Sequence, residues 1–173
     1  MAAHRPFVPF PNPVLKARAA EVPGVDDDIR AVWDEMLAAM YAMPGVGLAA
    51  PQLGIGLRLA VVDCSESNVE PVRLANPVLL SVSEETQTVR EGSPNLPGIW
   101  AEVTRPACVE VGFLDADGVA QERTFEGLWA TSVQHQIDHL DGKLFFDRLG
   151  PVRRQRLLAT WRKGRKAQAR RPG

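Results

Sequence analysis

Two histidines set four residues apart constrain this chain more than any other feature of its sequence. His135 and His139 lie in the run Val133–Gly142, which reads VQHQIDHLDG. On a helix this spacing places both imidazoles on one face, one turn apart, where they can bind the same metal ion. The metalloprotease pattern H-E-x-x-H has the same geometry and uses its glutamate as the general base. Here Gln136 stands at the glutamate position, and an amide cannot transfer a proton at neutral pH.

Length and composition indicate an ordinary globular protein. The 173 residues are expected to form a single domain over 1–173, with an apolar fraction of 45% and a charged fraction of 24%. We see no run near the roughly 18 apolar residues of a membrane span, and no secretory signal at the N-terminus. Two cysteines, Cys64 and Cys108, do not make a disulfide framework. A reduced, cytoplasmic setting without membrane contact is therefore expected.

Charge is distributed unevenly along the chain. Residues 148–173 contain ten Lys or Arg and no acidic residue, so all 21 acidic residues precede them. A basic C-terminal helix or tail from about residue 150 favours an anionic partner such as RNA or a ribosome. The alternative is a solvated, poorly ordered terminus without a partner.

The hydrophobic pattern predicts an α+β fold with helices packed on mostly antiparallel strands. A proline-rich arm over 7–23 precedes a helix that begins at Asp26–Asp28 and ends near residue 42. Residues 45–52 are small and turn-prone, and 72–82 are expected to form a strand and then a bend. Further strands are predicted over 57–63, 86–90, 100–103, 108–114 and 121–126, and helices over 128–140 and 152–163.

Three short segments share their order and spacing with one known family. They are GVGLAAPQ at 45–52, EGSPNLPG at 91–98 and QHQIDHLDG at 134–142. Together they resemble the peptide deformylases, which remove the formyl group from the N-terminal formyl-methionine of nascent bacterial chains. The likeness covers roughly residues 7–150. It implies a deformylase-like fold with a central helix that bears the histidines, followed by a C-terminal helix.

The resemblance also implies roles for individual residues. His135 and His139 would bind a divalent metal ion, usually ferrous iron in this family, with zinc or nickel able to replace it. Gln52 would donate a hydrogen bond to the oxyanion that develops during hydrolysis. The peptide groove would be lined by Gly45, Val46, Gly47 and Pro94.

The chain departs from the family pattern at the proposed centre. Ser93 stands where the family has a cysteine ligand, and a neutral hydroxyl binds metal more weakly than a thiolate. Pro94 replaces the leucine whose N–H is the second oxyanion donor, and proline has no N–H. Gln136 replaces the general base. We therefore expect a degenerate centre in which ordinary deformylation is lost or strongly weakened.

Three functions remain open from the sequence. The first is a binding module that retains the groove for a peptide N-terminus and does not hydrolyse it. The second is an active metal-dependent deformylase, or an amidohydrolase for another acylated amine, with a rearranged centre. In that case Glu91, Asp138 or water would replace the base, although a salt bridge is the favoured role for Glu91. The third is a nucleic-acid binder that acts through the basic C-terminus.

Overall fold

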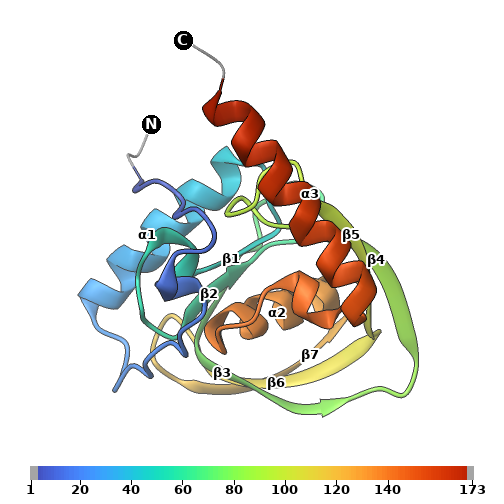
Figure 1. Ribbon diagram of the computed structural model, residues 1–173. Helices are drawn as coiled ribbons and strands as arrows, with labels where there is room; N and C mark the ends of the chain where they lie inside the picture. The colour runs from blue at the N-terminus through green and yellow to red at the C-terminus, as the bar shows by residue number, and fades with distance from the viewer. Residues whose placement is uncertain (1–3, 171–173) are drawn as a thin grey trace.

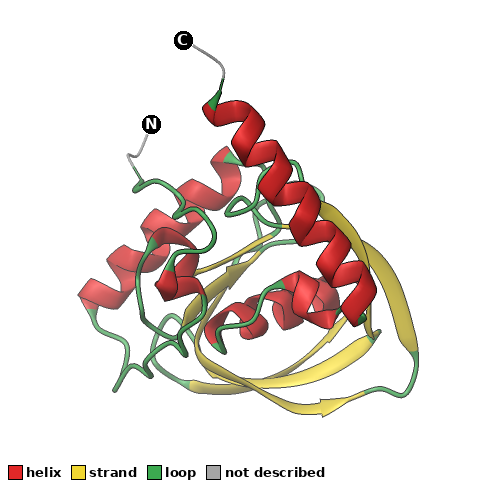
Figure 2. Ribbon diagram, in the orientation of Figure 1, coloured by secondary structure: helices red, strands yellow, loops and turns green. Residues whose placement is uncertain are grey.

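The computed structural model describes residues 4–170, whose strands form two antiparallel sheets (Figures 1 and 2). The larger sheet has the order β1-β2-β3-β6-β7, and β4 pairs with β5 alone. Among residues 4–170, none of the helices combines the length and hydrophobicity that crossing a bilayer requires. The strands are Gly47–Ala49 (β1), Leu59–Val62 (β2), Val72–Val82 (β3), Thr86–Gly92 (β4), Trp100–Pro106 (β5), Cys108–Leu114 (β6) and Ala120–Glu126 (β7).

The helix that contains both histidines lies at the centre of the molecule. This helix, α2 (Gly127–Leu140), is buried at every position from Ala130 to Leu140, and Figure 1 shows the larger sheet curving around it. Val133 and Ile137 pack into the core against that sheet. Because 3.6 residues complete a turn, His135 and His139 project from another side of the helix.

A second helix covers the opposite face of the larger sheet. Helix α1 (Asp27–Ala42) begins where the Asp26 carboxylate accepts a hydrogen bond of 2.9 Å from the Ile29 N–H. Its apolar stripe includes Trp33 and Met36 and packs against alternate residues of β2. The sheet is therefore covered on both faces, which fixes the position of β1 beside α2.

The last helix lies beside the β4–β5 hairpin (Figure 1). Helix α3 (Pro151–Ala169) has no fully buried residue. It is attached through Leu157, Leu158 and Trp161, which pack on a cluster that includes Phe145 and Phe146. The 3-10 turns are Pro13–Leu15, Ala50–Leu53 and Phe145–Arg148.

The structure confirms the predicted α+β fold around a central motif-bearing helix. Three local predictions need correction. Residues 47–49 form a strand within the segment expected to be a turn, because they pair with β2. Residues 72–82 form one strand whose register shifts, without a separate bend. The basic C-terminus is helical to Ala169, not a poorly ordered tail up to that point, and residues 171–173 lie outside the described part.

Candidate active site

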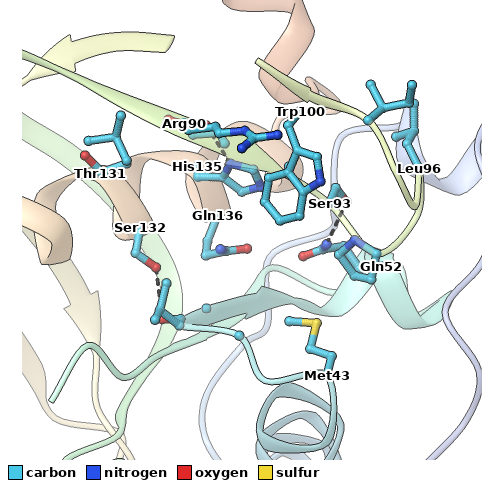
Figure 3. Close-up of a pocket in the computed structure, with 18 of the residues that line it drawn as sticks. Met43, Gln52, Arg90, Ser93, Leu96, Trp100, Thr131, Ser132, His135 and Gln136 are labelled. Carbon is cyan, nitrogen blue, oxygen red and sulfur yellow. Dashed lines mark hydrogen bonds and ion pairs between the residues drawn. The ribbon is translucent and has the colours of Figure 1, made fainter. Parts of the chain in front are cut away.

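Helix α2 brings the predicted metal ligands together. The ring centroids of His135 and His139 lie 5.0 Å apart, with a tilt of 58° between the planes. Gln136 lies between them in sequence and turns toward β1, and His135 and Gln136 both line a pocket of about 410 Å³ (Figure 3). The i, i+4 spacing thus produces the paired imidazoles expected from the sequence.

Glu91 orients the first histidine. Its Oε2 lies 2.8 Å from Nδ1 of His135, which leaves Nε2 as the ring nitrogen available for another partner. Arg105 donates to the same carboxylate at 2.6 and 3.0 Å and to Asp138 at 2.8 Å. Burial alone would raise the pKa of Glu91, but the hydrogen bonds from His135 and Arg105 outweigh it and lower the pKa.

These ion pairs bear on the identity of a replacement base. Asp138 also pairs with Arg148, and the hydrogen bonds and charges of the two arginines lower its pKa despite burial. Both carboxylates are therefore ionised and hydrogen-bonded, as expected for the salt-bridge role of Glu91. A carboxylate with a lowered pKa is a weak proton acceptor, so neither is suited to replace the base.

His139 is the most unusual group at the site. It is 0% exposed, and neither of its ring nitrogens has a hydrogen-bond partner among residues 4–170. Complete burial, followed by the neighbouring His135, lowers the pKa of His139 well below its ordinary value. The imidazole is therefore neutral, which is the form that binds metal ions. Gln136 Oε1 is likewise buried and unpaired within the described chain.

The loop after β4 holds the serine that stands at the cysteine position. Ser93 donates to Asn95 Oδ1 at 2.9 Å and accepts from Gln52 Nε2 and the Asn95 N–H, both at 3.3 Å. Both lone pairs of the hydroxyl are thus already in use. Within residues 4–170, no three His, Cys, Asp or Glu side chains form a metal-binding group. The two imidazoles fit a metal ion, and Ser93 could join them only by giving up a hydrogen bond.

The oxyanion donor expected from the resemblance is engaged in this loop. Gln52 Nε2 also donates to Asn95 Oδ1 at 2.9 Å, and Gln52 Oε1 accepts from the Ala49 N–H at 2.9 Å. Pro94 lines the pocket but offers no N–H. The amide of Gln52 would have to exchange a partner before it could donate to a substrate.

The glycine wall fits the expected groove. Gly45, Val46 and Gly47 all line the pocket. A Cβ on Gly47 would lie only 2.5 Å from both Gln136 Nε2 and Ser132 Oγ, so Gln136 can occupy its place only because residue 47 is glycine. Gly47 therefore leaves the space that the Gln136 side chain occupies.

Two pocket residues were not predicted as site residues. Trp100 is 56% exposed, and the Arg90 guanidinium lies 5.6 Å from the centre of its ring. The two side chains lie side by side above the pocket in Figure 3. They come from the paired strands β4 and β5, and no local sequence signal places them at the site. Arg105 was also missed.

Comparison with known proteins identifies the family. A family model for polypeptide deformylases matches residues 4–155. The chain belongs to the peptide deformylase family. It is 40% identical over 173 residues to the peptide deformylase of Methylocella silvestris, covering 97% of this chain and 88% of that protein. It is 43% identical over 152 residues to that of Acinetobacter baumannii, covering 88% and 86%.

Solved deformylases have the same fold. The crystal structure of the Legionella pneumophila enzyme superposes with a TM-score of 0.88 at 37% identity, covering 98% of this chain and all of the other. The Ehrlichia chaffeensis enzyme in complex with actinonin gives 0.86 at 30% identity, covering 94% and 98%. The deformylase family is metal-dependent.

These comparisons correct one functional expectation. We expected a degenerate centre in which ordinary deformylation is lost or strongly weakened, and that interpretation is wrong. Relatives that match this chain over nearly its full length are named as peptide deformylases, which supports an ordinary deformylase. The comparisons favour the alternative that the protein is an active metal-dependent deformylase.

Proposed function

We propose that this protein is a metal-dependent deformylase of N-formyl peptides. The observation that supports this most directly is His139, a neutral, fully buried imidazole with both nitrogens unpaired within residues 4–170, beside His135 at the pocket. An unpaired buried polar group costs about 1–3 kcal/mol. A metal ion shared by the two histidines would remove that cost, and the deformylase fold supports this assignment.

His135 and His139 would hold the metal ion, with Ser93 Oγ as a weak third ligand. When bound, the ion polarises the formyl carbonyl and lowers the pKa of water. Glu91 fixes the ring orientation of His135 through Nδ1, which keeps Nε2 directed away from the carboxylate. The hydrogen bond between Nδ1 and Glu91 makes His135 a better metal ligand.

Gln136 can orient the attacking water or the substrate by a hydrogen bond, but its amide cannot accept the proton that the water releases. Its unpaired Oε1 can accept a hydrogen bond from the attacking water or from the substrate N–H. Since no carboxylate with an ordinary pKa lines the pocket among the described residues, the attacking water would release its proton to solvent through the mouth of the pocket, and the leaving amine would take up a proton from solvent by the same route. Gln52 would donate to the oxyanion after exchanging its bond to Asn95.

The walls of the pocket suit the formyl-methionyl end of a peptide. Met43, Val46, Leu96 and Leu128 provide an apolar surface for an unbranched side chain. Strand β1 is at the edge of its sheet, and β4 pairs only with β5, so each has a backbone edge available for an extended peptide. This favours a peptide over a small acylated amine.

Formate release from a formyl-methionyl peptide, with iron, nickel or zinc supplied, tests the proposal. We expect metal-dependent turnover and one metal ion per chain by elemental analysis of the untagged protein. His135→Ala and His139→Ala should lose both metal and activity while keeping the fold by circular dichroism. Absence of formate release with all three metals, from protein that is folded, would reject the proposal.

We also propose that α3 contacts the ribosome in the cytoplasm. Its distal part includes Arg162, Lys163, Arg165 and Lys166, and the helix contains no acidic residue. A run of cationic side chains on an exposed helix suits a phosphate backbone. Arg162→Gln with Lys163→Gln should weaken ribosome binding and reduce its salt dependence. Unchanged binding across a salt series would contradict this contact. Charge substitutions are preferable to deletion, because Leu157 and Trp161 pack on the core.

A further inference from the structure

A second pocket lies between the β4–β5 hairpin and the start of α3. Its volume is about 420 Å³, and its walls include Arg90, Trp100, Glu102, Arg153 and Arg156. Arg153 donates to the Glu102 carbonyl at 3.2 Å, which fixes the first turn of α3 against β5. The pocket is thus formed by two elements that are held together.

The charge of this second pocket is positive. None of the ion pairs among residues 4–170 includes Arg90, Arg153 or Arg156. Glu102 lies opposite Arg90 in the β4–β5 register and offsets one of the three positive charges. All three arginines are exposed residues, so their guanidinium groups can reach an anion that enters the pocket. Three guanidinium groups around one pocket therefore indicate an anionic ligand.

Trp100 connects this pocket to the candidate active site. Both Trp100 and Arg90 line the first pocket as well as the second. The ring lies directly against Gly92, where a Cβ would be 2.5 Å from the ring atom Cε3, so the indole depends on glycine at its register partner. Arg90 covers the ring at 5.6 Å. The wall shared by the two pockets is therefore built from a specific arrangement of three residues.

We propose that the second pocket is a subsite for an acidic side chain of the peptide substrate, downstream of the formylated residue. The proposal rests on the proposed function, because it assumes a peptide whose first residue occupies the first pocket. A chain that leaves the first pocket along the open edge of β4 passes Trp100 and Arg90 and reaches Arg153 and Arg156. A carboxylate there could accept hydrogen bonds from both α3 arginines.

The presence of Glu102 in the second pocket favours a peptide over RNA as the ligand of this pocket. Glu102 lies in its wall and would repel a continuous phosphate backbone, whereas a single carboxylate can bind on the arginine side. The longer run of basic residues, which suits RNA, lies further along α3 at Arg162 to Lys166. The two basic regions can therefore be tested independently.

A set of formyl-Met peptide amides tests the subsite. A single Glu is moved through positions three to six, and each peptide is compared with its Gln counterpart. For one position we expect a KM about fivefold lower for Glu than for Gln at low salt, with kcat similar and the difference reduced by salt. Arg153→Gln with Arg156→Gln should remove that preference. The matched control, Arg162→Gln with Lys163→Gln, removes the same charge outside the pocket and should retain it.

Binding of fluorescently labelled peptides, measured by anisotropy, separates this proposal from the proposed function. If no peptide is hydrolysed but the Glu preference persists and depends on Arg153 and Arg156, the subsite stands and the activity does not. Equal binding of Glu and Gln peptides at every position would overturn the subsite. It would also be overturned if the Arg153 and Arg156 substitutions weakened binding of a single-stranded RNA and left the peptides unaffected.

Discussion

Glu91 Oε2 and His135 Nδ1 lie 2.8 Å apart, and this contact determines which nitrogen the histidine offers to the pocket. The carboxylate is only 5% exposed and is held on its other side by Arg105. The partner of His135 is thus itself fixed by a buried ion pair. The orientation of the His135 ring consequently depends on Glu91 of β4 and Arg105 of β5, neither of which needs to touch the metal ion.

Glu91→Gln is expected to weaken metal binding about 10- to 100-fold, because an amide orients His135 less well and makes it a poorer ligand. The affinity can be measured by competition with a chelator. Glu85→Gln is the matched control, because Glu85 is an exposed carboxylate just before β4. If both variants bound metal like the wild type, the orienting role of Glu91 would be wrong.

The sequence predicted the parts of this site that depend on local spacing. We predicted correctly that the His135 and His139 rings lie close together, because residues four apart on a helix lie one turn apart on the same face. Helix α1 was located from the acidic residues at its start and its apolar stripe, and most strands from the hydrophobic pattern. Strand β1 was missed because three residues show no period, and its identity depends on pairing with β2.

The unpredicted residues are those whose role depends on contacts distant in sequence. Arg105 has no local pattern that distinguishes it from a surface arginine, yet it is 3% exposed and joins Glu91 to Asp138. Trp100 lies at the pocket with its ring against Gly92, its register partner on the neighbouring strand, and this contact is also distant in sequence. The altered residues at 93, 94 and 136 were recognised, but the loss of activity inferred from them was wrong.

Gln136→Glu should raise kcat at neutral pH about tenfold, because a carboxylate can accept the proton that the amide cannot. The gain should fall short of the roughly 10²–10⁴-fold effect of a general base, since Ser93 remains and Pro94 has no N–H. Formate release measures the rate. Gln136→Met introduces a side chain of similar length that cannot accept a proton, and it should show no gain in kcat. A decrease in kcat for the glutamate variant would contradict the proposed proton path.

Gly47→Ala should lower kcat/KM about 10- to 100-fold without unfolding the protein. The new Cβ would lie 2.5 Å from Gln136 Nε2 and Ser132 Oγ, so both side chains must move. Gly56→Ala is the control, because nothing lies within 4 Å of the position of its Cβ. Normal activity of Gly47→Ala would show that the position of Gln136 is unimportant.

Arg105→Leu should lower the free energy of unfolding by about 3–5 kcal/mol, because it leaves Glu91 and Asp138 buried without their shared cation. Urea unfolding measures the loss. Arg73→Leu breaks a pair with Asp34, whose side chain is 71% exposed, and should cost about 0–1 kcal/mol. Equal losses in the two variants would mean that the buried network adds nothing beyond a surface pair.

Tyr41 and Asp63 make stability sensitive to alkaline pH. The Tyr41 hydroxyl donates to Asp63 Oδ2 at 2.6 Å, and burial together with this bond raises the pKa of Tyr41 to about 12 from its ordinary value of 10.0. A folded pKa above the unfolded value means that the contribution is fully present below pH 10 and is lost between pH 10 and about 12.

Denaturant unfolding at pH 9 and pH 11 should therefore show a smaller decrease in stability for Tyr41→Phe than for the wild type, because phenylalanine has no proton to lose. The variant should be the less stable protein at pH 9, where the hydrogen bond to Asp63 is intact in the wild type. The difference between the two proteins should narrow at pH 11. A difference that is constant across this range would show that Tyr41 does not titrate there.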